Sequence, residues 1–360
     1  MARVRSPRTP VRRFLLIPTA IIAAIVALLP LTTANALGQS GHIITFDAPG
    51  AGTSDYHGTF PYGMNSDGTV AGWVTNLDGT AGFIRSTDGK MSIIQVPGAD
   101  VTEVFSINDS GTIAGLDFKG LHTEGFLRTP DGRLTSYFPD GAQFLLSPNR
   151  IDNLGNVAGT FTNYYGGGCY LRAADGTITD FHPPSAFACE VNDIVDGTIS
   201  GTNGDPIESP GNAFLRNPDG TFTIFQVGYQ TGLAAINSEG VAAGYFVWLD
   251  SEQGHWQGYV REANGVITHF DMPGAFSITP TDINSSGTVT GNYTSWDLAY
   301  HGFERLPDGT IETFDVPGAG TGIYQGTVPN KINAAGSITG LFIDSNNVYH
   351  GFLLTPQLER

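Results

Sequence analysis

The sequence predicts an all-β fold, and more specifically a seven-bladed β-propeller with four antiparallel strands in each blade. Three short motifs recur in a fixed order, seven times each, at intervals that suit propeller blades of ~40 to 50 residues. The chain has 48 glycines and only 14% charged residues, a composition typical of short strands joined by tight turns. After residue 36 no segment keeps the 3.6-residue period of a helix over three turns.

The first motif is N-x-x-G or a close variant, and its seven copies begin at Asn65, Asn108, Asp152, Asn192, Asn237, Asn284 and Asn333. The second places a small residue before an aromatic one, and the third is a strand end of the form F-D-x-P-G. Asn at the first and Gly at the fourth position favour a type I turn. We therefore interpret the first motif as turn chemistry.

One repeat unit shows the expected strands. Between residues 279 and 315, strand a runs into Ile283, strand b is GTVTGNY, strand c is HGFERL and strand d is TIETFD. Segments such as L-P-D-G join strand c to strand d, because Pro presets φ for the turn. The a-to-b and c-to-d turns are uniform, whereas the b-to-c and d-to-a connections vary.

The two ends of the repeat region predict how the propeller closes. HIITFD (residues 42–47) is a d strand with no a, b or c strand before it, and HGFLL (residues 350–354) is a c strand with no d strand after it. The first strand is therefore expected to complete the last blade, which removes exposed sheet edges.

The pattern I-N-x-x-G…H-G-F-L…D-G-x-x-T-x-F-D-x-P-G-A resembles that of the probable extracellular HAF-repeat proteins of bacteria, over residues 41–355. The chain departs from the His-Ala-Phe signature, since His precedes Gly-Phe only at His301 and His350 and Gly mostly replaces Ala. The resemblance implies an exported or surface-attached repeat protein and carries no general activity.

Residues 1–36 have the three parts of a secretory signal peptide. Five arginines are followed by an apolar run from Phe14 to Leu31 and by the small-residue segment TANA, which predicts cleavage after Ala36. An uncleaved membrane anchor and twin-arginine export are the alternatives. Residues 37–360 are expected to form one domain, located outside the cell, in the periplasm or at the cell surface.

The exported part is strongly acidic. The leader holds five of the 17 lysines and arginines and none of the 34 acidic residues, so the remaining chain has a formal charge of −22. Nucleic-acid binding requires clustered positive charge, and no basic stripe is present. We expect a monomer without a cofactor.

Candidate ligand-binding residues lie in the variable connections, because rigid scaffolds usually carry function on such loops. Tryptophans accompany polar and acidic residues in units five and six: Trp248, Asp250, Glu252, His255, Trp256, Trp296, Asp297 and Tyr300. A secondary patch comes from the long d-to-a connections of units one and seven: Tyr56, His57, Tyr62 and Tyr324. Trp73 aligns with Tyr245, which favours a core position for it.

Aromatic rings beside carboxylates suit a glycan, because rings stack on the apolar faces of sugars and carboxylates accept hydroxyl hydrogen bonds. We therefore predict a non-catalytic binding module for a glycan or another surface protein. The alternative is a secreted polysaccharide lyase or glycoside hydrolase, with His57 and Asp55 or His255 and Glu252 as base and acid. A purely structural repeat protein is the third interpretation. No catalytic motif and no metal-binding spacing distinguishes these residues.

The two cysteines, Cys169 in strand c of unit three and Cys189 in strand a of unit four, are a possible disulfide in an exported chain. Strand a is expected to be innermost and strand c third from the axis, a separation that argues against the bond. The sequence leaves this question open.

Overall fold

The structure is a computed structural model that describes residues 41–164, 166–186, 188–205, 209–248 and 255–357. The predicted leader, residues 1–36, lies outside the described residues. All regular secondary structure in the described ranges is β-strand. Within those ranges the structure contains no helix of the length and hydropathy needed to cross a membrane.

The strands pair in antiparallel groups of four, which match the repeat units and are numbered here in chain order. Units 1 and 2 consist of β2 (Gly58–Met64), β3 (Val70–Asn76), β4 (Gly79–Arg85), β5 (Met91–Ile94), β6 (Val101–Ile107), β7 (Ile113–Lys119), β8 (His122–Arg128) and β9 (Leu134–Tyr137). Units 3 and 4 consist of β10 (Phe144–Ile151), β11 (Val157–Asn163), β12 (Gly166–Arg172), β13 (Ile178–Phe181), β14 (Ala188–Val195), β15 (Thr198–Asp205), β16 (Ser209–Arg216) and β17 (Phe222–Phe225).

Units 5 and 6 consist of β18 (Gln230–Ile236), β19 (Ala242–Val247), β20 (Trp256–Arg261), β21 (Ile267–Phe270), β22 (Ala275–Ile283), β23 (Val289–Ser295), β24 (Tyr300–Arg305) and β25 (Ile311–Phe314). Unit 7 consists of β26 (Gly326–Ile332), β27 (Ile338–Ile343), β28 (Tyr349–Pro356) and β1 (Gly41–Phe46). The a, b, c and d strands predicted between residues 279 and 315 are confirmed as β22 to β25.

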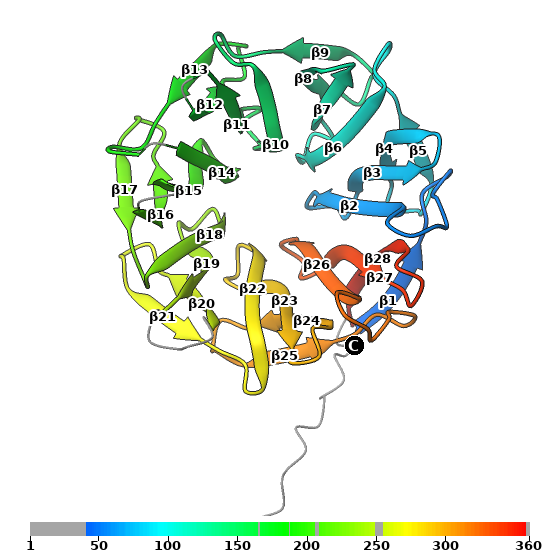
Figure 1. The fold of residues 1–360 in the computed structure, drawn as a ribbon, viewed down its shortest axis with the longest axis vertical. Coiled ribbons are helices and arrows are strands. Elements are labelled where there is room, and N and C mark those ends of the chain that lie inside the picture. The colour runs from blue at the N-terminus through cyan, green and yellow to red at the C-terminus, as the bar shows by residue number, and fades with distance from the viewer. Residues whose placement is uncertain (1–40, 165, 187, 206–208, 249–254, 358–360) are drawn as a thin grey trace, which may run out of the picture. The chain divides into compact units, whose positions relative to one another are not determined.

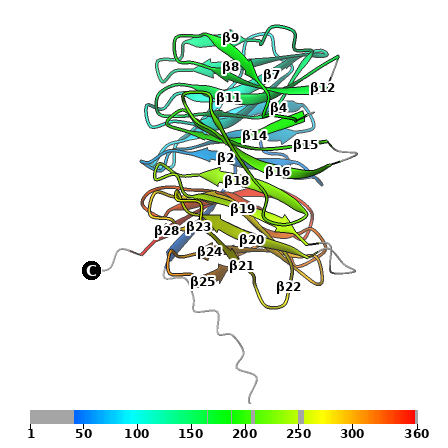
Figure 2. The same cartoon turned by 90° about the vertical axis from the view of Figure 1, so that its left-hand side faces the viewer.

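The groups of residues 41–357 are arranged around a common axis, with the first strand of each unit innermost (Figure 1). Since successive strands are antiparallel, the a-to-b and c-to-d turns lie on one face, which we call the turn face. The b-to-c and d-to-a connections lie on the opposite face, which we call the loop face. Figure 2 shows the same arrangement from the side, with the strands running between these two faces.

The chain's first and last strands pair with each other. β1 lies antiparallel to β28, with Gly41 opposite Pro356 and Phe46 opposite Gly351. The side chain of Asn330 also donates to the carbonyl oxygen of Pro61 in unit 1, at 2.6 Å. Contacts between residues about 270 positions apart therefore join unit 7 to unit 1.

Every innermost strand contains a register shift of the kind produced by a β-bulge. In unit 6 the shift falls between Pro280 and Asp282, opposite the glycine of strand b. A Cβ at Gly291 would lie 2.2 Å from the carbonyl oxygen of Thr279. Only glycine permits this approach, which explains why a glycine recurs in strand b of each unit.

The asparagines of the first motif connect neighbouring units as well as forming turns. The Oδ1 atom of Asn284 accepts the backbone N–H of Thr288 at 3.0 Å, and its Nδ2 atom donates to the carbonyl oxygen of Asn333 at 3.2 Å. The Asn237 side chain donates in the same way to the Asn284 carbonyl oxygen, at 2.9 Å. The sequence indicated the turn role of this motif and not its role between units.

Asp152 stands at the asparagine position of the first motif in unit 3, and it also makes a contact with the next unit. A carboxylate cannot donate a hydrogen bond, and the Oδ2 atom of Asp152 instead accepts the backbone N–H of Gly197 in unit 4, at 2.8 Å. In unit 4 the connection between β14 and β15 is a two-residue turn, Asp196 and Gly197, and Asn192 lies within β14. The prediction that the first-motif turn of this unit begins at Asn192 was therefore wrong. Units 3 and 4 are therefore still joined by a hydrogen bond at this position, but the first-motif side chain accepts the bond instead of donating it.

A second repeated contact joins the outer strands. Arg305, at the end of β24, lies over the ring of Phe270 in unit 5, with its guanidinium carbon 5.2 Å from the ring centroid. Four other arginines at the same position make equivalent contacts with Phe46, Tyr137, Phe181 and Phe225. Such cation–π contacts contribute about 0.5 to 2 kcal/mol each, depending on exposure.

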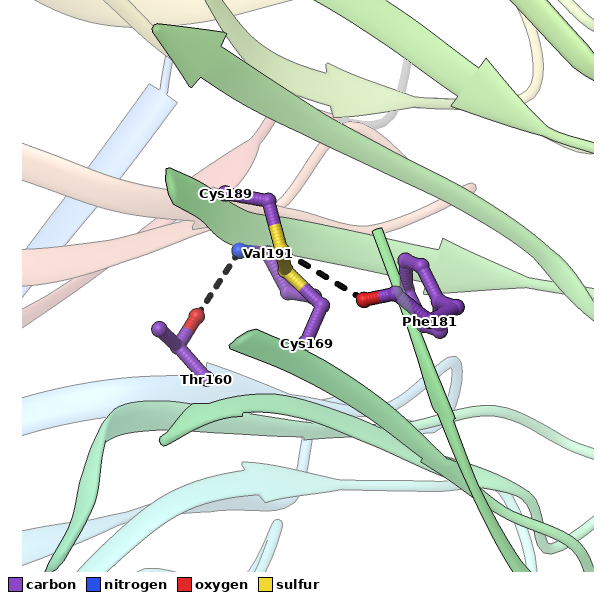
Figure 3. The surroundings of a disulfide bond; sticks show 5 residues. All are labelled: Thr160, Cys169, Phe181, Cys189 and Val191. Carbon is purple, nitrogen blue, oxygen red and sulfur yellow. Dashed lines mark hydrogen bonds between the residues drawn. A yellow bond between two sulfur atoms is a disulfide. The ribbon is translucent and has the colours of Figure 1, made fainter. Parts of the chain in front are cut away.

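Cys169 and Cys189 form a disulfide, with their Cα atoms 6.0 Å apart (Figure 3). The disulfide that the sequence left open is therefore present. The separation of strands a and c within a unit does not prevent it, because neighbouring units pack face to face and strand c of unit 3 covers strand a of unit 4. Thr160 Oγ1 accepts the backbone N–H of Val191 at 3.0 Å beside the bond. Both cysteines are buried in the cluster between these two units.

We expect Asn284→Asp to lower the free energy of unfolding by about 1 to 3 kcal/mol. The substitution keeps an acceptor for Thr288 and removes the donor to Asn333. Denaturant unfolding measures the effect, with the exposed neighbour Ser285→Ala as the control. Equal stability of both variants would contradict a role for Asn284 between units.

Loss of the disulfide in a Cys169→Ser, Cys189→Ser variant is expected to cost about 3 kcal/mol, because the bond closes a short loop in the unfolded chain. Reductant should destabilise the unchanged protein by a similar amount and leave the double variant unaffected. Two free thiols in the denatured, unreduced protein would refute the bond.

Candidate functional site

The predicted tryptophans of units 5 and 6 contact aromatic residues of their own units. Trp248 is 44% exposed and packs edge-on against Phe246, while Trp296 is 62% exposed and packs edge-on against Phe276. Trp256 lies at the start of β20, where it stacks on Tyr245. No ring contact joins Trp248 to Trp296, both of which are described. The structure therefore shows two exposed indoles and no single tryptophan surface.

The polar members of this patch have local partners. Asp297 accepts a hydrogen bond from Ser295 Oγ, which lowers the pKa of the Asp297 carboxyl. His255 Nε2 lies 2.9 Å from Asp271. Asp250 and Glu252 lie outside the described residues, so the structure does not place the predicted pairing of His255 with Glu252.

The secondary patch is divided between loops and a strand. Tyr56 and Tyr324 are loop residues that are 70% and 59% exposed. His57 Nδ1 lies 3.0 Å from both Ser54 Oγ and the carbonyl oxygen of Asp55, so its contact with Asp55 is with the backbone and not with the carboxylate. Tyr62 lies within β2, where burial raises its pKa.

Tyr56 and Tyr324 occupy equivalent positions in two nearly identical connections, FDAPGAGTSDYHG (residues 46–58) and FDVPGAGTGIYQG (residues 314–326). Both have positive φ, 65° and 60°. Non-glycine residues rarely adopt this conformation, which costs on the order of 1 kcal/mol and is often found at functional sites. The same strained tyrosine is therefore present twice.

Each strained tyrosine lies beside a second tyrosine from the preceding unit. The backbone N–H of Tyr349 donates to His57, and that of Tyr56 donates to Asn347, both at 2.9 Å. In the second copy Tyr300 donates to Gln325 and Tyr324 to Leu298, both at 2.8 Å. We call Tyr56 with Tyr349 the first tyrosine pair, and Tyr324 with Tyr300 the second tyrosine pair.

Raised pKa values of Tyr300 and Tyr349 agree with the close approach of the tyrosines in the two pairs. Burial is the main cause that raises the pKa of Tyr300, and the neighbouring phenols of Tyr324 and Tyr349 add to the rise. Burial also raises the pKa of Tyr349, with a further contribution from Tyr56. The rings of Tyr300 and Tyr324 lie 6.2 Å apart. The four tyrosines thus form a continuous group at units 6, 7 and 1.

A stack of aromatic rings supports the first tyrosine pair. Phe60 stacks on Tyr349 with ring centroids 4.7 Å apart, and on Trp73 with centroids 3.9 Å apart. Tyr62 continues the stack on Trp73 at 5.9 Å. These contacts hold Tyr349 in place, and they pack the partly buried Trp73 against the core.

Tyr349 was not predicted from the sequence, and Tyr300 was assigned to the patch of units 5 and 6. The signal was available, because Y-H-G-F occurs twice, at residues 300–303 and 349–352. The Y-H-G-F motif points to the tyrosine pairs only once strand c of one unit is seen to lie beside the d-to-a connection of the next. That adjacency follows from the packing between units.

The histidines of Y-H-G-F pair with the aspartates of F-D. His301 Nδ1 lies 3.0 Å from Asp315, and His350 Nδ1 lies 2.9 Å from Asp47. The hydrogen bond to Asp315 raises the pKa of His301. These pairs connect strand c to the residue that follows strand d, which explains why the two motifs occur together in units 6 and 7.

A polar pocket of about 260 Å³ opens on the turn face, lined by the ends of all the innermost strands. We call it the axial pocket. Lys331 Nζ lies 3.0 Å from Asp282 and 3.7 Å from Asp193 within it. Burial raises the pKa of Asp282, while the Lys331 ammonium acts in the opposite direction. This pocket is on the face opposite the predicted loops. Residues of the first motif line it, but the sequence indicated only a turn role for them.

Charge is distributed unequally between the two faces. Six arginines end strands at the turn face: Arg85, Arg128, Arg172, Arg216, Arg261 and Arg305. Lys90 and Arg133 lie in turns of that face, and Arg150 and Lys331 lie near the turn-face ends of their strands. Lys119 is the one lysine or arginine in the described residues that lies at the loop face.

The loop face carries carboxylates around the tyrosine pairs. Asp55 precedes Tyr56 in its loop, and Asp297 lies in the turn before Tyr300. Asp344 lies in the turn that contains Asn347, the partner of Tyr56. This part of the surface is therefore aromatic and acidic without a neighbouring lysine or arginine.

Several solved structures are similar to this chain. Virginiamycin B lyase from Staphylococcus aureus superposes with a TM-score of 0.58 and 17% identity, covering 88% of this chain and all of that one. The β-propeller domain of the Trilobed protease from Pyrococcus furiosus gives a TM-score of 0.60 and 12% identity, covering 82% of this chain and 95% of that one. The chain has a β-propeller fold. No protein-family model and no curated protein matches the sequence.

At these identities the similarity establishes the fold alone, because propellers with the same architecture support unrelated functions. Function must therefore be argued from the surface of this chain. The tyrosine pairs and the axial pocket are the two sites to compare.

We expect the His301–Asp315 pair to make stability depend on pH. The pKa of His301 is raised above its ordinary value of 6.5 in the folded state. The pair therefore stabilises the fold fully below that value and loses this contribution as the pH rises through the raised pKa.

Asp315→Asn should consequently destabilise the protein more in mildly acidic than in alkaline solution, measured by thermal unfolding. Its NMR titration should also show a lower pKa for His301. Glu312→Gln, three residues earlier in β25, is the charge-matched control. A pH-independent difference between Asp315→Asn and the unchanged protein would contradict the assignment.

Proposed function

We propose that this protein is an exported, non-catalytic binding module whose loop face recognises a glycan. Its units are the seven blades of one propeller, closed where β1 completes the last blade. Export is supported by the predicted leader and by the disulfide, a bond typical of proteins outside the cytoplasm. Membership of the HAF-repeat family is part of the same proposal, and a surface location agrees with it.

The tyrosine pairs are the observation that supports binding. Tyr56 and Tyr324 keep large rings exposed at an energetic cost in the backbone, and a core position cannot explain either ring. Tyrosine faces stack on the apolar faces of pyranoses, and the nearby carboxylates and amides can bond sugar hydroxyls. Trp248 and Trp296 extend the aromatic surface of the same face in units 5 and 6.

A polysaccharide lyase or glycoside hydrolase is the second candidate, and one observation favours it. Asp193 and Asp282 are paired carboxylates that line the axial pocket, and acid–base catalysis needs such groups. Lys331 contacts both of them, however, and its charge opposes the rise in the pKa of Asp282 that a general acid requires. The loop face therefore supports binding better than the pocket supports catalysis.

Incubation of the protein lacking residues 1–36 with a panel of plant and microbial polysaccharides tests these two candidates. Retention of the protein without release of reducing or unsaturated ends is the expected result. Release of such ends, abolished by Asp282→Asn, would establish the enzyme instead. A protein neither retained nor active on any member of the panel would contradict the glycan proposal.

Two double variants locate the binding surface. Tyr56→Ala, Tyr324→Ala should weaken retention by about 25-fold, because each exposed aromatic contact contributes about 1 kcal/mol. Trp248→Ala, Trp296→Ala tests the tryptophans of units 5 and 6 in the same way. Tyr229→Ala, an exposed loop-face tyrosine of unit 5 outside both sets, is the control.

Unchanged affinity of the tyrosine double variant would remove the tyrosine pairs as the site. Unchanged affinity of the tryptophan double variant would remove Trp248 and Trp296. Melting temperatures of all three variants should equal or exceed that of the unchanged protein, since none of these rings is buried.

A further inference from the structure

The two tyrosine pairs are copies of one structure on neighbouring units. In each copy a tyrosine with positive φ is held by backbone hydrogen bonds to the start of strand c in the preceding unit, where the second tyrosine lies. The connections that carry Tyr56 and Tyr324 belong to units 1 and 7, which are joined through the pairing of β1 with β28. Two equivalent aromatic surfaces therefore lie one unit apart on the same face.

Repeated, equivalent surfaces are suited to a ligand that itself repeats. A chain that occupies one tyrosine pair raises the effective concentration of its next segment at the other pair, which strengthens binding without any new contact. A monomeric ligand gains nothing from the second copy. This arrangement favours a polymer over a single sugar.

The charge of the surface narrows the class of polymer. Asp55, Asp297 and Asp344 lie close in sequence to the tyrosine pairs, whereas the arginines of units 1 and 6 and the lysine of unit 7 lie at or near the turn face. Polymers of uronic or sialic acids would meet like charge. A protonated amine is attracted both to carboxylates and to the face of a tyrosine ring.

We propose that the two tyrosine pairs are subsites for one chain of amino sugars that carry free, protonated amines, such as a glucosamine polymer. This inference rests on the proposed glycan-binding function and adds the charge and the polymeric form of the ligand. Tyr56 and Tyr324 stack on successive parts of the chain, while Asp55 and Asp297 pair with its ammonium groups.

The test compares glucosamine oligomers with N-acetylglucosamine oligomers of equal length, and with the corresponding monomers, in mildly acidic buffer by isothermal titration calorimetry. Glucosamine oligomers should bind at least tenfold more tightly than both the acetylated oligomers and the monomer. Added salt should weaken this preference, because exposed charges are screened. Uronic acid oligomers should not bind.

Variants assign the effect to residues. Asp55→Asn and Asp297→Asn should each weaken glucosamine oligomer binding by about threefold and leave N-acetylglucosamine oligomers unaffected. Asp131→Asn, a turn-face carboxylate, is the matched control. Tyr324→Gly should weaken binding without lowering the melting temperature, because glycine relieves the positive φ. A purely structural role for Tyr324 predicts lower stability.

The outcomes are distinguishable. Equal affinity for charged and acetylated oligomers would overturn the charge assignment and leave the glycan-binding proposal intact. Equal affinity for monomer and oligomer would overturn the twin subsites. Tight binding of polylysine, unaffected by the tyrosine variants, would overturn the inference in favour of a basic protein partner. Failure of every glycan to bind would overturn both proposals.

Discussion

The structure depends on one repeated contact, the hydrogen bond from an asparagine side chain in one unit to a backbone carbonyl oxygen in the next. Asn237 donates to Asn284 and Asn284 to Asn333, while Asn333 donates to Ser66 in unit 1 at 3.4 Å. In units 6 and 7 the asparagine that accepts one such bond at its carbonyl oxygen donates the next from its side chain, so these contacts fix the positions of neighbouring units from unit 5 to unit 1. Arginine–aromatic contacts repeat the same relation at the outer strands, so the faces of the propeller inherit a regular geometry.

That regularity explains how function can arise from duplication. The connections at residues 46–58 and 314–326 differ at few positions, and the contacts between units place both of them against equivalent Y-H-G-F segments. The two tyrosine pairs are thus consequences of the repeat and of the pairing between unit 7 and unit 1. The histidine–aspartate pairs join strand c to the residue after strand d in the same units, next to the tyrosines in the sequence.

The sequence predicted the all-β architecture, the strands of each unit and the pairing of the first strand with the last, because turn residues and alternation are local signals. It could not predict relations between units. Asn284 was interpreted as a turn residue alone, the disulfide between Cys169 and Cys189 was left open, and Tyr349 was not selected. Each of these three features depends on which strand of one unit packs against which strand of the next. Local patterns along the sequence do not encode that packing. Asp250 and Glu252 remain predictions, since they lie outside the described residues.

A crystal structure of the chain lacking residues 1–36, soaked with a glucosamine oligomer, tests the central claim most directly. The account predicts sugar rings stacked against Tyr56 and Tyr324, with one continuous chain between the two tyrosine pairs. Sugar bound in the axial pocket beside Asp193 and Asp282, with both tyrosines unoccupied, would contradict it and assign the function to the opposite face.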